Sequence, residues 1–324
     1  MSSDEPYGYL LAHFREDPAG FAERIHFSLS TGDSPLRWTP LWGGRPRLTS
    51  NLGTTGVRDP AIVRGRDGRF HILATDLRVF GGDDRGWDEW RRHGSRSMII
   101  WDSKDLVDWT GPRAVEVAPA EAGMAWAPEV IDDPESDGFI VFWSSTLYEP
   151  LDVEHTGESY SRILFSRTRD FVTFTPAQVM IDAGRDIIDT AIVAAGGVIH
   201  RFSKDEDRSD ASWGIHHEIG SSLFADDFRV VRRRIAAELH RDVEAPILVK
   251  DPVLPRWYLM LDRYGSEHGY FVLQTDDLRS SEWAPVPADE VEIPDATKHG
   301  TVLRLTHSEW LRLRHAGARE DRDE

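Results

Sequence analysis

The chain of 324 residues contains no cysteine. Without a thiol the protein has no disulfide bond, no thiolate metal ligand and no cysteine nucleophile. An excess of positive charge is lacking too, because 56 Asp and Glu against 38 Lys and Arg give a formal net charge of −18. Nucleic-acid binding depends on cations that neutralise phosphates, so we expect no nucleic-acid partner.

Long apolar runs are also absent. No run approaches the roughly 20 residues that a membrane-spanning helix needs, so we expect no membrane partner. Residues 1–6 lack the basic stretch and apolar core of a secretory signal. These observations predict a cytoplasmic protein, although a processed mature form would look the same. The sequence leaves the oligomeric state open.

Helical patterns are scarce, and strand patterns fill most of the chain. One short amphipathic helix is expected at 308–314, with Thr306 as its N-cap. The 26 Gly and 18 Pro are spread without forming a linker, so we expect one all-β domain over residues 1–314. Residues 315–324 end in six charged residues and are expected to form a charged, disordered tail.

Five segments repeat along the chain, each with one or two polar residues before a strand-forming run. The polar residues are Asp59, Glu129, Asp189, Glu244 and His299, with spacings of 70, 60, 55 and 55 positions. A repeat of this length fits one four-stranded antiparallel blade of a β-propeller. The sequence therefore predicts a five-bladed β-propeller.

A second repeat supports five blades and predicts how the ring closes. After each third strand comes a polar turn and then an aromatic residue, which we expect to pack between neighbouring blades. These aromatic residues are Trp38, Trp109, Phe174, Phe228 and Trp283. Counting strands places 301–305 in one blade with 9–14, 25–30 and 38–41. The N- and C-terminal strands would then share a sheet and leave no open edge.

The innermost strands of a propeller converge on its axis, so Asp59, Asp189 and Glu244 would meet at one mouth. Three carboxylates can hydrolyse a glycosidic bond, because one protonates the leaving oxygen while another activates water on the opposite face of the sugar. The third, close to the acid, would raise the proton affinity of the acid by like-charge repulsion. This chemistry requires no cofactor.

The segments around these residues resemble glycoside hydrolase family 43. The matching segments are Val57-Arg58-Asp59-Pro60-Ala61-Ile62, Trp126-Ala127-Pro128-Glu129-Val130, Ile187-Ile188-Asp189 and Val243-Glu244-Ala245-Pro246. The similarity spans the chain from about Asp59 to His299. It implies a five-bladed propeller that hydrolyses arabinosides, xylosides or related glycosides with inversion of configuration.

The resemblance also implies a role for each carboxylate: Asp59 as general base, Asp189 as orienter and pKa modulator, and Glu244 as general acid. The modulator is commonly followed by proline in the family, whereas Thr190 follows Asp189 here. Asp186 lies three residues upstream and stays open as an alternative, although the phase of the strand favours Asp189.

His299 occupies a place where the family often has a histidine that holds an axial ion such as Ca²⁺ through water. No Asp-rich calcium loop is visible in the sequence, and a lone histidine is more often structural. An ion near His299 is therefore an expectation from the resemblance.

Sugar rings offer apolar faces and a rim of hydroxyls, which aromatic residues and polar side chains bind. The candidates for substrate contact are Trp126, Glu129, Trp143, Arg263 and Phe80, the last in a loop rich in Gly and aromatic residues. Two have a structural alternative: Trp143 as core between blades, and Arg263 as a partner of Asp262 or Glu267.

The leading hypothesis is an inverting glycosidase that acts on small pentose-containing carbohydrates, an α-L-arabinofuranosidase first and a β-xylosidase second. A catalytically inactive carbohydrate-binding propeller is an alternative, which the three carboxylates weigh against, as they do against a protein scaffold. A glycoside phosphorylase would need a basic cluster for phosphate, and none is apparent near the inner strands. The sugar, the linkage and the exo or endo mode stay open.

Overall fold

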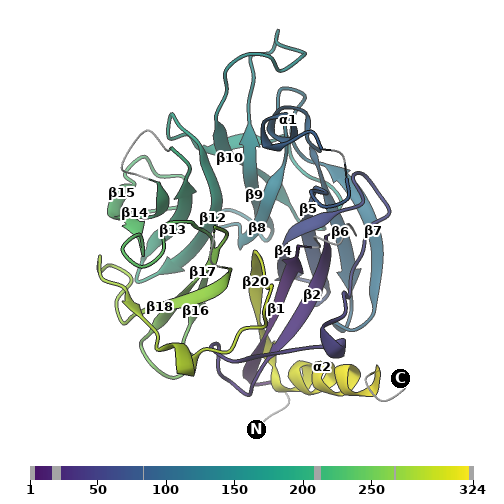
Figure 1. The fold of residues 1–324 in the computed structure, drawn as a ribbon, viewed down its shortest axis with the longest axis vertical. Coiled ribbons are helices and arrows are strands. Elements are labelled where there is room, and N and C mark those ends of the chain that lie inside the picture. The colour runs from purple at the N-terminus through teal and green to yellow at the C-terminus, as the bar shows by residue number, and fades with distance from the viewer. Residues whose placement is uncertain (1–3, 17–22, 83, 208–212, 266–267, 321–324) are drawn as a thin grey trace.

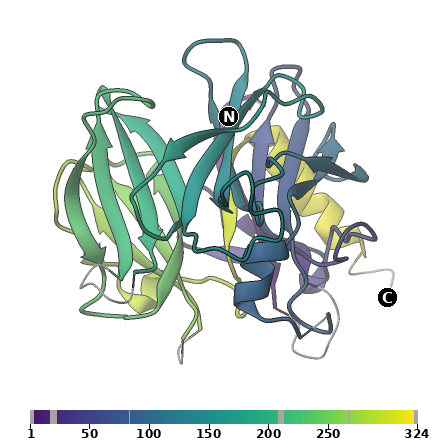
Figure 2. The ribbon, with the colours of Figure 1, turned by 90° about the horizontal axis from the view of Figure 1, so that it is seen from above.

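The computed structural model describes residues 4–16, 23–82, 84–207, 213–265 and 268–320. These residues form five four-stranded antiparallel sheets arranged as blades around an axis, as Figures 1 and 2 show. The prediction of a five-bladed β-propeller is confirmed. Neither α-helix of the described residues is long and apolar enough to cross a membrane.

Each blade is a meander that starts at the axis and runs outward, and we number the blades from β4. Blade I contains β4 (Val57–Arg64), β5 (Phe70–Asp76), β6 (Ser97–Ser103) and β7 (Trp109–Glu116). Blade II contains β8 (Trp126–Asp132), β9 (Phe139–Thr146), β10 (Ser161–Thr168) and β11 (Gln178–Ile181). Blade III contains β12 (Ile187–Ala195), β13 (Val198–Asp205), β14 (Gly214–Gly220) and β15 (Arg229–Ile235). Blade IV contains β16 (Val243–Lys250), β17 (Trp257–Arg263), β18 (Gly269–Thr275) and β19 (Ala284–Pro285).

Blade V closes the ring with strands from both ends of the chain. Its order is β20 (Gly300–Thr306), β1 (Pro6–Arg15), β2 (Arg24–Ser30) and β3 (Trp38–Pro40). β20 pairs with β1 in an antiparallel register that places Leu303 opposite Leu10. The predicted closure is confirmed, and pairing of these two strands leaves the ring without an open edge at the axis.

Apolar side chains fill the spaces between neighbouring blades. Four of the five predicted aromatic residues belong to or pack against such clusters, namely Trp38, Trp109, Phe174 and Trp283. The fifth, Phe228, has the Arg201 guanidinium of its own blade III 3.6 Å from its ring centroid. Trp143 is 1% exposed and lies in the cluster that joins blades I and II. A side chain so enclosed cannot reach a sugar. The prediction that Trp143 binds substrate is wrong, and its alternative role in the core is confirmed.

Two α-helices and two short 3₁₀ helices accompany the blades in the described residues. They are α1 (Trp87–His93), α2 (His307–Glu320), η1 (Trp42–Gly44) and η2 (Ala288–Glu290). α2 begins with a capping box, because the Glu309 N–H donates to the Thr306 hydroxyl and the Thr306 N–H donates to the Glu309 carboxylate. The predicted N-cap is confirmed. The helix continues to Glu320, so a disordered tail from residue 315 is wrong, and residues 321–324 lie outside the described part.

α2 fastens blade V to blade I at the lower edge of the ring in Figure 1. Glu309 also accepts hydrogen bonds from Arg64 of β4, and the Trp310 indole N–H donates to the Ser30 carbonyl of β2 over 3.0 Å. Trp310 lies so close to Gly8 that a Cβ there would be 2.3 Å from the indole, and Gly8 has a φ of +69°. Only glycine fits this contact without strain.

The innermost strands of blades I to IV share one irregularity that the repeat did not predict. In each strand the pairing with its neighbour shifts register by a β-bulge, and the bulge contains a non-glycine residue with positive φ. These residues are Asp59, Ala127, Asp189 and Ala245, with φ between 49° and 53°. Such backbone is unfavourable for residues with a Cβ and is found preferentially at functional sites.

Candidate active site

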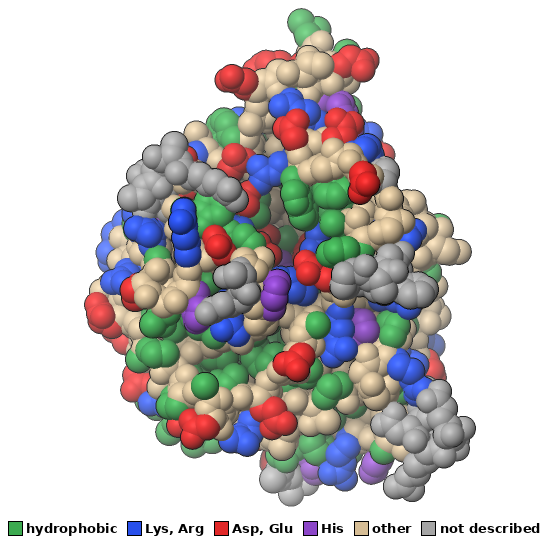
Figure 3. Space-filling model, viewed as in Figure 1, with side chains coloured by type: hydrophobic (Ala, Val, Ile, Leu, Met, Phe, Trp, Pro, Cys, Tyr) green, Lys and Arg blue, Asp and Glu red, His purple; other side chains and the backbone are tan. Residues whose placement is uncertain are grey.

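The bulges bring the predicted carboxylates to the axis. Asp59 and Asp189 lie in the bulges of β4 and β12, and Glu244 immediately precedes the bulge of β16. Their side chains keep 15%, 11% and 24% of their surface exposed, so all three can reach a molecule at the mouth. Figure 3 shows a hollow at the centre of this face, with acidic, basic and histidine side chains gathered around it.

Asp59 and His299 form an ion pair at the axis. Nδ1 of His299 lies 3.5 Å from Oδ1 of Asp59 and 4.0 Å from Oδ1 of Asp189. Burial opposes the charge of His299, but the carboxylates of Asp189, Asp59 and Glu129 outweigh it and raise the pKa of His299 to about 9. Burial likewise opposes the charge of Asp59, but the hydrogen bond and charge of His299 lower the pKa of Asp59.

Asp189 contacts the backbone beside Glu244. Its Oδ2 accepts a hydrogen bond from the Ala245 N–H over 3.3 Å, while its own N–H donates to the Ser144 hydroxyl. Burial raises the pKa of Asp189 to about 6, His299 opposes the rise, and Glu244 and Asp59 add to it. The alternative carboxylate, Asp186, instead accepts hydrogen bonds from Arg91 and from a backbone amide of β10. Asp189 is therefore the one of the two that faces the axis.

Glu244 is held by a lysine that the sequence did not point to. Nζ of Lys204 in β13 lies 3.0 Å from Oε2 of Glu244. Burial alone would raise the pKa of Glu244, but Lys204 first and Lys298 next lower it. The prediction that like-charge repulsion keeps Glu244 protonated is wrong. The neighbouring carboxylate Asp189 has the raised pKa instead.

We call the region around the axis, where the carboxylates meet, the hub. Lys204 belongs to a set of four residues near the hub end of the second strand of blades I to IV, namely Thr75, Ser144, Lys204 and Asp262. Each contacts a residue in, or just before, the inner strand of the following blade. The Thr75 hydroxyl accepts from the Ala127 N–H over 2.8 Å, and Ser144 does the same for Asp189. In sequence, Thr75, Ser144 and Asp262 lie near the ends of mostly apolar strands, and this signal could have identified them. Lys204 has no such signal, because its strand already contains a histidine, an arginine and a serine.

Asp262 and Lys298 form a second buried pair next to Glu244. Nζ of Lys298 lies 2.8 Å from Oδ2 of Asp262, and the two side chains are 5% and 0% exposed. Burial raises the pKa of Asp262 to about 7 despite the charge of Lys298. The expectation that no basic cluster lies near the inner strands is wrong, because Lys204, Lys298 and Arg58 all lie there.

Glu129 is the first paired residue after the bulge of β8 and lies two positions after the residue with positive φ, so it is not the equivalent of Asp59 and Asp189. Ala127 holds that place in blade II. Glu129 still faces the hub, where enclosure raises its pKa to about 8, with His299 opposing and Asp189 adding to the rise. Its carboxyl is therefore neutral at pH 7 and able to donate a hydrogen bond.

The other predicted substrate contacts lie at the rim. Trp126 is 8% exposed and meets the edge of Trp87, which is 53% exposed. Phe80 is half-buried in the loop before α1. Arg263 donates to two backbone carbonyls of its own hairpin, which favours the structural alternative, and its other proposed partner Glu267 lies outside the described residues. Contact of Trp126, Phe80 and Arg263 with a sugar stays a prediction.

The residues around His299 do not fit a metal ligand set. Among the described residues, no group of three or more His, Cys, Asp and Glu is arranged to hold a metal ion. An imidazole with a pKa of about 9 is protonated at neutral pH and has no lone pair for a metal. The expected ion near His299 stays a prediction, and the chemistry of the carboxylates does not depend on it.

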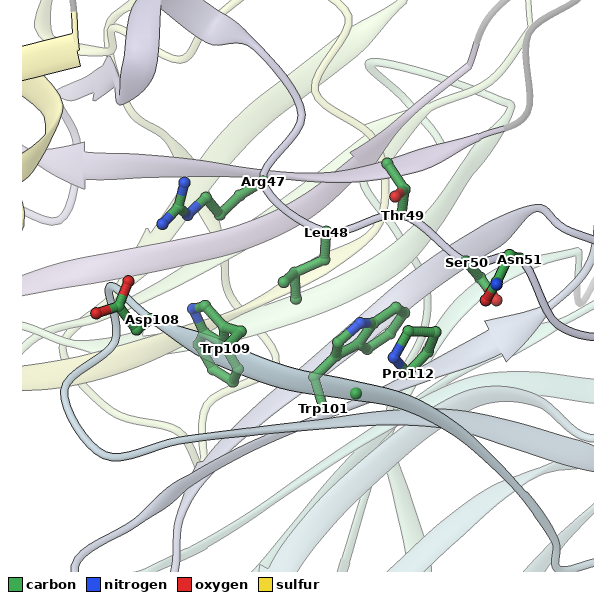
Figure 4. A pocket seen from close by; sticks show the side chains of 10 residues that line it. Arg47, Leu48, Thr49, Ser50, Asn51, Trp101, Asp108, Trp109 and Pro112 are labelled. Atoms are coloured by element: carbon green, nitrogen blue, oxygen red, sulfur yellow. The ribbon is translucent and has the colours of Figure 1, made fainter.

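A separate cavity of about 580 Å³ is lined by residues 47–51, which connect β3 to β4, and by residues of β6 and β7 in blade I (Figure 4). None of the three carboxylates lines it. Its wall includes Trp101, Trp109 and Arg47. The Trp109 indole N–H donates to Leu106 and Arg47 donates to Val107, so both bind the protein itself. The chemistry of the hub does not extend into this cavity.

A five-bladed propeller with converging carboxylates at its axis defines a glycosidase type of domain. A family described as a probable glycosyl hydrolase domain, related to glycosyl hydrolase family 43, matches residues 5–310. The chain belongs to this family, which confirms the resemblance and extends it to the N-terminal blade.

The relatives are consistent with this family. An α-L-arabinofuranosidase of Bifidobacterium longum is 30% identical over 237 residues, which are 69% of this chain and 22% of the relative. The chain thus spans about a fifth of that protein. A family 43 β-1,3-galactosidase solved with galactodeoxynojirimycin has a TM-score of 0.59 at 11% identity, over 90% of this chain and 92% of that one. The family 62 α-L-arabinofuranosidase domain of Coprinopsis cinerea has a TM-score of 0.52 at 13% identity, over 74% and 72%. At these identities the two structures show the shared fold alone.

Proposed function

We propose that the protein is an inverting glycoside hydrolase that acts on small pentose-containing glycosides, with α-L-arabinofuranosides first and β-xylosides second. The observation that carries this proposal is the convergence of Asp59, Asp189 and Glu244, from three different blades, on one hollow at the axis. The arabinofuranosidase relative favours arabinose over xylose.

Asp59 is the general base in this proposal. Its lowered pKa keeps it ionised at neutral pH, as a group that takes a proton from water must be. His299 holds Asp59 in place through the ion pair. Glu244 lies in a different blade and is the general acid, which gives its proton to the leaving oxygen on the other face of the sugar.

Asp189 orients the acid through the hydrogen bond from the Ala245 N–H. The Asp189 and Glu244 carboxyls interact, and in the free protein Asp189 has the higher proton affinity, because its pKa is raised to about 6 while that of Glu244 is lowered. The acid role requires a proton on Glu244 when substrate is bound. We therefore expect kcat/KM to fall as the pH rises through about 6.

Hydrolysis is favoured over phosphorolysis by the charge balance of the hub. The three cations near the carboxylates each lie beside an acidic partner: Lys204 beside Glu244, Lys298 beside Asp262, and Arg58 beside Glu23. A phosphate would have to compete with these partners for the same cations, whereas a neutral sugar would not.

The proposal is tested with a panel of aryl α-L-arabinofuranosides, β-D-xylosides and β-D-galactosides. We expect Asp59→Asn to lower turnover about 10²- to 10⁴-fold on every substrate that the protein cleaves. Glu244→Gln should lower it by a similar factor for poor leaving groups and far less for activated ones, since only the former need acid assistance. Equal losses for both would remove Glu244 from the acid role.

Proton NMR of the first-formed sugar tests the stereochemistry. We expect the anomer opposite to that of the substrate, because base and acid act from opposite faces. A product that retains its configuration would contradict the inverting mechanism.

A further inference from the structure

Lys204 is enclosed among groups that suit a cation. It is 2% exposed, and Nζ lies 3.0 Å from Oε2 of Glu244 and 3.3 Å from Oε1 of Glu206. The ammonium also lies over two aromatic rings, 3.9 Å from the centroid of Tyr264 and 5.2 Å from that of Trp213. Two carboxylates and two ring faces offset the loss of water that so buried an ion suffers.

The position of Lys204 is one that other blades use to hold an inner strand. Thr75 and Ser144 accept hydrogen bonds there from a bulge amide of the following blade. In blade III the long side chain of Lys204 reaches past the backbone to the carboxylate of Glu244. At this position, blade III therefore binds a side chain of the following blade, whereas Thr75 and Ser144 bind its backbone.

The lysine also connects Glu244 to the helix of the rim. Glu206 forms a close ion pair with Arg91 of α1, and Arg91 lies 3.3 Å from Asp186. An alternating series of charges thus runs from α1 through Arg91, Glu206 and Lys204 to Glu244.

We propose that Lys204 is a positioning residue for Glu244: it fixes the orientation of this carboxylate and stabilises its negative charge, including the charge that returns when the acid gives up its proton. The part that concerns turnover rests on the proposed function. The ion pair and its effect on Glu244 do not.

Other charged groups near Glu244 also influence its pKa. Lys298 and Arg58 favour its ionised form, as Lys204 does. Asp189 of β12 and Asp262 of β17 repel Glu244 as like charges. The charge of Glu244 also helps to raise the pKa of Tyr270 in β18, although burial raises it most. Lys204 acts most strongly among the cations, and it is the one that contacts the Glu244 carboxylate in a hydrogen bond.

The direct test is a carboxyl ¹³C NMR titration of protein labelled at glutamate, with the Glu244 signal assigned by its absence in Glu244→Gln. We expect Lys204→Met to raise the midpoint of Glu244 by about 1 to 3 pH units, because an opposite charge at this distance has been removed. Lys204→Arg keeps the charge and should stay within about half a unit of the wild type. The matched control is Lys250→Met, since Lys250 is exposed and lies 6.0 Å from the Trp257 ring.

Two further variants test the series of charges, and their effects have opposite signs. Glu206→Gln removes a negative charge and a competitor for Lys204, so the Glu244 midpoint should fall. Arg91→Met frees Glu206 to compete for Lys204, so the midpoint should rise. An unchanged midpoint in a folded Lys204→Met variant, judged by a cooperative melt, would overturn the proposal. If Lys204→Met does not fold, a Lys204→Arg midpoint that rises by a unit or more would overturn it.

Activity separates this inference from the proposed function. In an active protein we expect Lys204→Met to move the fall of kcat/KM to higher pH and to lower kcat more for poor leaving groups than for activated ones. A wild type that cleaves no glycoside would overturn the proposed function and leave the NMR test intact. An active wild type with an unshifted pH profile in Lys204→Met would overturn the positioning role alone.

Discussion

At the scale of single residues, the exposed face of Trp87 suits a sugar. Trp87 opens α1, is 53% exposed, and meets the edge of Trp126 at 6.0 Å between ring centroids. The guanidinium of Arg58, next to the candidate base, lies 5.7 Å from the Trp87 ring centroid. A large apolar ring left open beside a polar hub is a natural platform for the C–H face of a sugar ring.

We predict that Trp87→Ala raises KM roughly 5- to 10-fold with little effect on kcat, because it removes stacking that acts equally on substrate and transition state. Steady-state kinetics on the best aryl glycoside measure it. The control is Phe224→Ala, since Phe224 is 38% exposed and packs on Phe165 of β10. A similar rise of KM in the control would argue against stacking at Trp87.

His299 should make the folded protein less stable in alkali. Its pKa is raised above the ordinary value of 6.5 to about 9 by the surrounding carboxylates. The resulting stabilisation is complete below pH 6.5 and is lost as the pH rises through about 9, on the order of 3 kcal/mol at most. Urea denaturation at pH 6 and 9.5 should show this loss in the wild type and a smaller loss in His299→Gln. Equal losses in both proteins would mean that the Asp59 pair does not stabilise the fold.

The repeat placed Asp59, Asp189, Glu244 and His299 at the starts of inner strands. Because the inner strands of a propeller converge, the sequence predicted that these residues meet at the axis. The proton affinities could not be predicted in the same way. They depend on Lys204 and Lys298, which reach Glu244 from other elements and whose contacts leave no mark in a linear pattern. Trp143 shows the opposite limit, since a tryptophan in a strand has the same sequence signature in a pocket as in a core.

At the scale of elements, the repeat predicted strands but missed the bulges. A polar residue before a strand-forming run indicates where a strand starts and does not reveal an extra residue inside it. The structure places Glu129 directly after a bulge, whereas Asp59, which opens the corresponding repeat, lies inside one. A bulge interrupts the alternation of side chains between the two faces of a sheet. The face of a residue after the bulge therefore cannot be predicted by counting from a residue before it.

The capping box of α2 is an element whose contribution can be measured. We predict that Thr306→Ala lowers the free energy of unfolding by about 1 kcal/mol, since a backbone N–H at the helix start loses its acceptor. Thr306→Ser keeps the hydroxyl and serves as the matched control. Urea denaturation at pH 6 compares the three proteins. A loss in the serine variant as large as in the alanine variant would point to packing of the Thr306 methyl group in place of the cap.

At the scale of the whole molecule, closure of the ring is the feature that the sequence predicted best. Five repeats that start after residue 56 leave the last inner strand without partners unless the first 41 residues supply them. The structure places β20 in one sheet with β1, β2 and β3, and pairs it directly with β1. The hub depends on the same closure, because His299 directly precedes β20 and reaches Asp59 in blade I.

Deletion of residues 1–45 should therefore abolish cooperative folding. The deletion removes three of the four strands of blade V and leaves one edge of β20 and the neighbouring face of blade I uncovered. Core side chains such as Phe14, Phe27 and Trp42 are lost with it, each of which would cost several kcal/mol by itself. Deletion of residues 2 and 3, which precede β1, is the control and should melt like the wild type. Calorimetry and circular dichroism follow the transition, and a soluble 46–324 variant with a single sharp melt would show that four blades and β20 close without the N-terminal strands.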